Sequence, residues 1–248
     1  MDVVYDWFRQ LYLDHGINLT IIYDGFDRRR MINGLWTTIK LSLICLLLSI
    51  VIGVVGAWLQ GAKSLLLRMI VQGYIQFFRN TPPLVQMYFF FFALGNLMPQ
   101  IRNDFGFMEP MIDNYTWAII SLSFFAGAFN VEIFRSGIEA VPESTVEAAE
   151  ALGYSRLQAY IHVVMPLAMR VCLPSLNNNL VNLVKTTTLA YAIAVPEMLY
   201  VANQIWSDAV NVPEMMTFLL FAYVALVGLL VWVMRRWEHA MALPGFGR

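Results

Sequence analysis

The residues of this sequence best able to do chemistry are polar side chains inside apolar segments. Within residues 173–194, Asn178, Asn182 and Lys185 stand at i, i+4 and i+7, which places them on one face of a helix. Such groups are costly at membrane depth unless they face protein or water, so this face is a candidate lining for the path of a polar solute. Hydrogen bonding between helices is the alternative role for any one of them.

A second polar face is predicted within residues 115–131. There Ser123, Gly127 and Asn130 have the same spacing. Two such faces, from one subunit or from a pair of subunits, would line a translocation path.

A solute that carries charges of both signs would need donors for its anionic group and acceptors for its cationic group. Lys185, Asn182 and the neighbouring threonines suit the first task, and Glu132 suits the second. Glu132 and Arg135 are three residues apart, so an ion pair within one helix is the alternative for these charges.

A short helix is predicted in the loop between the third and fourth apolar segments. Ser144 is its expected N-cap, with Glu147 three residues later in the capping-box arrangement. Ala148 and Ala149 favour helix, and Gly153 suits the left-handed position at the end. The small residues leave a thin helix that a groove in another protein could accept.

Membrane helices must position these residues. The chain has 248 residues, 59% hydrophobic and 13% charged, and a hydrocarbon core of ~30 Å needs ~20 apolar residues per helix, so about five spans fit. We therefore predict an all-α integral membrane fold with an interfacial or periplasmic segment at 1–30, a transmembrane domain at 31–237 and a cytoplasmic tail at 238–248. The first, third, fourth and fifth expected spans are 31–59, 115–131, 173–194 and 214–237. The second contains Arg79 and ends with the apolar run 81–99. Pro82 and Pro83 should kink the second span.

Five spans put the two termini on opposite sides of the membrane, and basic residues decide which side is which. A periplasmic N-terminus and a cytoplasmic C-terminus leave only Arg102 in the loops after spans two and four. Seven basic residues then lie near or on the inner face: Lys63, Arg68, Arg135, Arg156, Arg235, Arg236 and Arg248. Arg28, Arg29 and Arg30 lie outside in this topology and argue against it.

The sequence lacks the residues that several other functions would require. The net charge of −1 disfavours nucleic acid binding, and the two cysteines and three histidines lack metal-binding spacing. The nearest approach to a P-loop, from Gly56 to Ser64, is one residue too long. A membrane enzyme would need a catalytic cluster that is not evident, whereas an ion-coupled secondary transporter or channel remains the alternative function.

The loop helix resembles a known motif. Glu147-Ala148-Ala149, then Gly153, then Val-Val-Met-Pro at 163–166, is similar to the EAA motif of permease subunits in type I ABC importers. The resemblance implies that this helix, with Glu143 at its start, docks into an ATPase subunit. The usual Ile-x-Leu-Pro ending is replaced conservatively here.

Neighbouring segments are similar to the polar amino-acid permeases of that class, the family of histidine, glutamine, glutamate and opine permeases. Phe-Arg-Asn-Thr-Pro-Pro-Leu-Val-Gln at 78–86 resembles their Phe-Arg-Gly-Thr-Pro-Leu-Leu-Val-Gln, and 132–142 and 183–189 also match. Thr186 replaces the usual Asp, and the loss of that anion disfavours arginine or lysine as the main cargo. The candidate path residues are Thr81, Gln86, Asn130, Glu132, Asn178, Asn182, Lys185 and Thr186.

The resemblance also implies partners. They are two copies of an ATPase that holds ATP and Mg²⁺, a second permease that is identical or homologous, and a periplasmic substrate-binding protein. The chain itself would bind no cofactor and no metal. It would lie in the bacterial inner membrane and move amino acids or their derivatives inward by alternating access.

Overall fold

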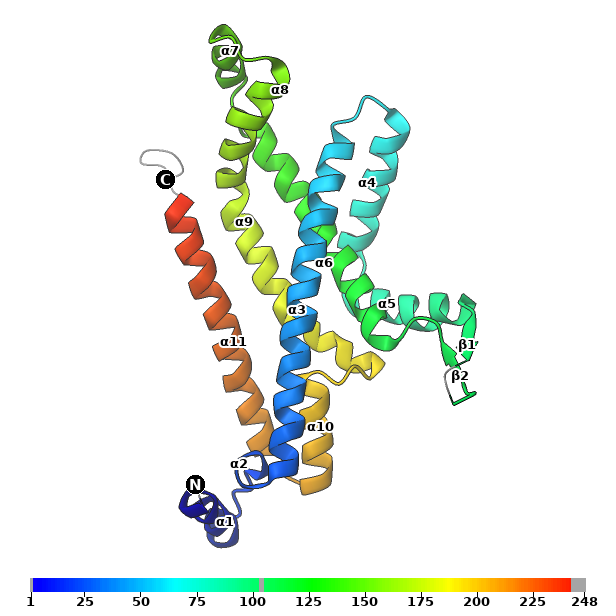
Figure 1. Ribbon diagram of the computed structural model, residues 1–248, viewed down its shortest axis with the longest axis vertical. Helices are drawn as coiled ribbons and strands as arrows, with labels where there is room; N and C mark the ends of the chain where they lie inside the picture. The colour runs from blue at the N-terminus through cyan, green and yellow to red at the C-terminus, as the bar shows by residue number, and fades with distance from the viewer. Residues whose placement is uncertain (1, 103–104, 242–248) are drawn as a thin grey trace. The chain divides into compact units, whose positions relative to one another are not determined.

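The computed structural model describes residues 2–102 and 105–241, and Figure 1 traces its helices. Residues 242–248 of the expected tail lie outside this range. In chain order the elements are α1 (Asp2–His15), α2 (Thr20–Tyr23), α3 (Gly25–Gln60), α4 (Leu65–Asn80), α5 (Pro83–Tyr88), the π-helix η1 (Phe89–Leu94), the 3₁₀-helix η2 (Gly95–Leu97), β1 (Gln100–Arg102), β2 (Met108–Pro110), α6 (Asn114–Glu139), α7 (Glu143–Ala151), α8 (Arg156–Ala159), the π-helix η3 (Tyr160–Val164), α9 (Met165–Thr186), the 3₁₀-helix η4 (Thr187–Ile193), α10 (Met198–Ala209) and α11 (Val212–Met241). The antiparallel strands β1 and β2 form a hairpin.

The described chain divides into two compact units, each assembled from separate stretches of sequence. The first contains the described residues up to Ile44, Leu84–Ile120 and Val184–Gly228. The second contains Cys45–Pro83, Ser121–Leu183 and the described residues from Leu229 onward. Each of the long helices α3, α6 and α11 therefore contributes residues to both units.

Four helical stretches among the described residues are long and apolar enough to cross a membrane. They are Gly25–Gln60, Asn114–Glu139, Arg156–Ile193 and Val212–Ala240. These stretches correspond to four of the five expected spans, and each begins before the expected start. The helices extend beyond the apolar segments because backbone hydrogen bonding continues through polar residues that favour helix.

The remaining expected span, the second, is broken at its prolines. α4 ends at Asn80, Thr81 is extended, and a new helix begins at Pro83, so the predicted kink is a full break. The Thr81 hydroxyl donates to the carbonyl of Phe77 at 2.7 Å and satisfies one of the last acceptors of α4. Proline disfavours helix at the residue before it and is well suited to the first helical position. A fifth crossing remains a prediction.

The core of the first unit lies where α2, α3, α10 and α11 meet. Gly34 of α3 allows close approach, because a Cβ there would lie 3.0 Å from Cγ2 of Val201 in α10. The buried residues of this core are Ile21, Met31, Met198, Val201, Ala202, Ile205, Met215 and Leu219.

Glu197 is a fully buried carboxylate at the start of α10. It accepts hydrogen bonds from the N–H of Leu199 at 2.9 Å and of Tyr200 at 2.8 Å, and from the hydroxyl of Tyr223 in α11 at 2.9 Å. Beside it, the hydroxyl of Thr38 in α3 accepts from the N–H of Met198 at 3.0 Å. These bonds connect three helices of the first unit.

The arginines at the start of α3 have partners in the same unit. Arg28 donates to the hydroxyl of Tyr5 at 2.8 Å. Arg30 donates to Asp208 at 3.1 Å and to Gln204 at 3.0 Å, both in α10. The two charges are therefore held by the protein, which gives them a structural role whichever side of the membrane they occupy. The orientation of the termini stays a prediction.

The second unit brings α3 and α6 into close contact through glycine. A Cβ at Gly53 would clash with Asn130, and one at Gly56 would clash with Val131. Small residues permit the backbone approach that drives helix association in lipid.

We expect Glu197→Ala to lower the stability of the permease, because it leaves two N–H groups and a hydroxyl buried without an acceptor. The expected loss is about 2 to 4 kcal/mol. Glu197→Gln retains one acceptor oxygen and should fall between wild type and alanine. The midpoint of thermal unfolding of the purified protein in detergent measures the order of the three stabilities. Equal midpoints for wild type and both variants would contradict the prediction.

Candidate functional site

The loop helix is α7, and its N-terminus differs from the prediction. The expected capping box of Ser144 and Glu147 is wrong, because the N-cap is Pro142 and no side chain caps the helix. The helix starts two residues earlier than a cap at Ser144 would require, and the N–H of Thr145 bonds to the carbonyl of Pro142 at 2.9 Å. The capping box lies in the next helix, where Ser155 caps α8 together with Gln158.

The C-terminal end of α7 is as predicted. Gly153 has a φ of +91°, the left-handed conformation that glycine adopts without strain. The N–H of Tyr154 returns to the carbonyl of Ala149 at 3.2 Å, which satisfies an acceptor in the last turn. This turn fixes the direction in which the chain leaves α7.

α7 buries one face against its own unit and exposes the other. Ala149 is buried, whereas Glu143, Glu147 and Ala148 are exposed. A pocket of about 560 Å³ lies between the end of α6, α7 and η3, and it is lined in part by Glu143 and Glu147.

The residues that follow α7 add an apolar surface that the sequence analysis missed. Leu152 is 81% exposed and Leu157 is 68% exposed, and Ile161 is also largely exposed. Their only sequence signal was their place beside the motif. A thin helix with exposed leucines next to it is a surface suited to another protein's groove.

Three consecutive asparagines of α9 have three different surroundings. Asn177 is buried and donates to Glu238 of α11 at 3.4 Å. Asn179 is buried and donates to Oδ1 of Asn130 at 2.7 Å and to the carbonyl of Ala126 at 3.1 Å, both in α6. Asn178 is exposed.

The predicted polar face of α9 is uncovered by the chain itself, since Asn178, Asn182 and Lys185 are all exposed. Thr186, which follows Lys185, is half-buried. A helix face that carries amides and an ammonium group can bind carboxylate and carbonyl oxygens. Its residues remain candidates for the path.

Asn130 has a clear structural role. It is fully buried, donates to the hydroxyl of Ser49 in α3 at 3.2 Å and accepts from Asn179. These bonds link α3, α6 and α9, which is the helix-to-helix alternative considered for such residues.

Glu132 forms its ion pair between helices rather than within one. Its partner is Arg79 of α4, whose guanidinium also lies 5.2 Å from the centre of the Phe129 ring. Arg135 pairs instead with Glu139 at 2.8 Å. Glu132 and Arg135 each form an ion pair, but not with each other, because the neighbouring helix offers Glu132 a cation.

The two remaining candidates lie on either side of the proline break. Thr81 is half-buried and caps α4, whereas Gln86 is buried within α5. Among the described residues, no group of three or more histidine, cysteine or carboxylate side chains could hold a metal ion.

Comparison with known proteins decides the family. The family described as "Binding-protein-dependent transport system inner membrane component" matches residues 49–242. The chain belongs to this family. It is thus the membrane-spanning subunit of an ATP-driven importer, a transport subunit and not itself an enzyme, and the family implies an ATPase and a substrate-binding protein as partners.

The permease has named relatives. It is 28% identical to the probable glutamine ABC transporter permease protein GlnM of Bacillus subtilis, over 85% of this chain and 91% of the relative. It is 30% identical to the histidine/lysine/arginine/ornithine transport system permease protein HisQ of Escherichia coli, over 68% and 74%. It is 35% identical to the probable amino-acid ABC transporter permease protein PatM of Vibrio harveyi, over 66% and 70%.

Solved structures confirm the fold class. A crystal structure of an amino acid ABC transporter with histidines matches with a TM-score of 0.74 at 24% identity, over 86% of the permease and 94% of that chain. An inward-facing MetNI methionine ABC transporter matches with a TM-score of 0.67 at 19% identity, over 86% and 96%. The all-α membrane permease fold is therefore established.

We expect Gly153→Val to reduce the amount of ATPase that co-purifies with the permease by about tenfold, since a β-branched residue is strained at positive φ and would redirect the end of α7. Gly153→Asn is the matched control, because asparagine tolerates this conformation and should retain most of the ATPase. Equal retention by both variants would contradict a role for this turn.

Proposed function

We propose that the permease carries amino acids or amino-acid derivatives from the periplasm to the cytoplasm by alternating access. The observation that carries the proposal is that Asn178, Asn182 and Lys185 are all exposed on one face of α9. The names of the relatives, which include glutamine, histidine and amino-acid permeases, support the class of cargo. The inner membrane of a bacterium is the corresponding location.

In this proposal, α7 couples ATP hydrolysis by the ATPase subunits to the conformation of the permease. Two ATPase subunits hold ATP and Mg²⁺, and each receives an α7 helix in a groove. Glu143, Glu147 and Ala148 supply the exposed contact, Ala149 packs against the permease, and Gly153 ends the helix. Nucleotide binding shifts the permease between conformations only if the ATPase dimer fits one of them better, and α7 is the contact through which that preference acts.

Cargo is recognised along α9. The ammonium group of Lys185 and the amide of Asn182 bind the carboxylate of an amino acid. Glu132 binds the cargo's ammonium group in this scheme, which requires it to exchange its ion pair with Arg79. Thr186 supplies no anion, so the preferred cargo is not strictly cationic. Thr81 and Gln86, beside the proline break, complete the path.

A second permease, identical or homologous, completes the membrane part. The apolar window of Val212–Ala240 is only 6% buried within this chain, so lipid or another subunit must cover α11. One subunit of this size does not enclose a path by itself. The periplasmic binding protein delivers cargo to the assembled pair.

We expect Glu147→Lys to abolish cargo-stimulated ATP hydrolysis by the permease and its ATPase in nanodiscs, with the binding protein and a panel of amino acids added. The reversed charge opposes the docking contact, and the stimulated rate should fall at least about tenfold. Asp14→Lys, the same reversal on an exposed face of α1, is the control and should keep the stimulation. If no ATPase co-purifies with the wild type, an ion-coupled secondary transporter or channel becomes the better interpretation of its function.

We expect Lys185→Gln to raise the cargo concentration needed for half-maximal ATPase stimulation by about tenfold, because one charge-assisted hydrogen bond to the carboxylate is lost. The basal rate without cargo should not change. Lys63→Gln, which removes an exposed lysine outside the path, is the matched control. An unchanged half-maximal concentration would remove Lys185 from the cargo site.

A further inference from the structure

Two adjoining pockets of the second unit lie at the C-terminal end of α3. The larger, of about 510 Å³, has a polar side formed by Gln60, Arg135 and Glu139. The smaller, of about 170 Å³, is almost wholly apolar. Both pockets are lined by Ala57, Trp58, Ile138 and Tyr160. The shared walls make them one site with a polar mouth and an apolar interior.

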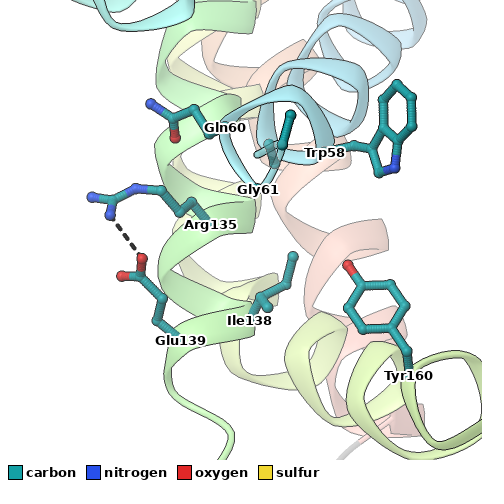
Figure 2. Close-up of a pocket in the computed structure, with 9 residues that line it drawn as sticks. Trp58, Gln60, Gly61, Arg135, Ile138, Glu139 and Tyr160 are labelled. Carbon is teal, nitrogen blue, oxygen red and sulfur yellow. Dashed lines mark hydrogen bonds and ion pairs between the residues drawn. The ribbon is translucent and has the colours of Figure 1, made fainter. Parts of the chain in front are cut away.

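The mouth presents both signs of charge. Arg135 and Glu139 form an ion pair at 2.8 Å, and their side chains are 46% and 61% exposed. Figure 2 shows this pair on one side of the site and the rings of Trp58 and Tyr160 on the other. A guanidinium that is half exposed can still bind a phosphate, and a carboxylate that is half exposed can still bind an ammonium group.

The interior is shaped for a hydrocarbon chain. Phe134 of α6 and Met165, Met169 and Cys172 of α9 line it, with Val54 from α3. Methionine side chains adapt to flexible apolar ligands. The site also lies where the apolar helix α3 gives way to Gln60 and Gly61, and tryptophan and tyrosine favour this boundary between hydrocarbon and headgroups.

We propose that this site binds one phospholipid with a zwitterionic, amine-bearing headgroup. Its phosphate binds Arg135, its ammonium group binds Glu139, and part of one acyl chain fills the pocket between α3, α6 and α9. Charge complementarity selects this lipid class, because an anionic headgroup would meet Glu139 and a headgroup without an amine would leave that carboxylate unmatched. The proposal holds whichever cargo the permease carries.

The bound lipid would contact the segment that carries α7. Tyr160 is the first residue of η3, which connects α8 to α9, and it also lines the pocket beside α7. A lipid bound in this site therefore restrains Tyr160, which lies in the chain between α7 and α9.

The test is lipid binding to the delipidated permease complex, measured by native mass spectrometry with dioleoyl phosphatidylethanolamine, phosphatidylcholine and phosphatidylglycerol. One molecule of phosphatidylethanolamine should bind about tenfold more tightly than phosphatidylcholine, whose quaternary ammonium donates no hydrogen bond. Phosphoethanolamine, the headgroup without chains, should not compete at equal concentration because the apolar pocket contributes to binding.

Two variants locate the site. Arg135→Gln should remove the tight lipid, and Glu139→Gln should reverse the preference toward phosphatidylglycerol, since the guanidinium is then unopposed. Arg68→Gln, at an exposed arginine of α4 away from the pockets, is the control and should behave as wild type. Lack of headgroup discrimination in the wild type, or an unchanged preference in a folded Glu139→Gln complex, would overturn the proposal. Displacement by phosphoethanolamine would also overturn it, by showing a site for the headgroup alone.

Discussion

The packing of the second unit depends on a chain of hydrogen bonds that joins one buried hydroxyl and two buried side-chain amides. Ser49, Asn130 and Asn179 connect α3, α6 and α9, and the chain ends on the carbonyl of Ala126. In lipid, no water is available to satisfy these groups, so each must find its partner within the protein. The partners exist only at one register of the three helices, and the polar chain thereby fixes the geometry that apolar packing alone would leave adjustable.

The glycines of α3 complement this chain. Gly53 and Gly56 let α6 approach closely enough for the amide of Asn130 to reach Ser49. Side-chain size and hydrogen bonding therefore act on the same contact. Asn177 and Asn179 make the contacts that α9 forms with its neighbours, whereas Asn178 is exposed. Adjacent residues of one type have different surroundings because a helix turns them in different directions.

Signals from residues close together in the sequence predicted much of the secondary structure. Contacts between side chains of different helices were harder to predict. Gly153 behaved as expected because glycine is free to adopt a left-handed backbone, whereas Pro82 and Pro83 broke the helix where a kink was predicted. The four long helices followed from apolar runs. For Glu132 the sequence suggested Arg135 as an alternative partner because only spacing along one helix is visible in a sequence, whereas its partner Arg79 comes from another helix. The predicted cap at Ser144 is wrong because Pro142 is the N-cap and the helix already begins at Glu143.

The π-helix η3 has a consequence for the length of the EAA motif. A residue inserted into or removed from an α-helix turns everything beyond it by about 100°. η3 lies between Gly153 and Pro166, so the number of residues there sets the heading of α7 relative to α9. A π-turn accommodates an extra residue within an otherwise regular helix. The spacing of the motif therefore acts as an angular setting, because the number of residues between Gly153 and Pro166 determines the direction in which α7 points relative to α9.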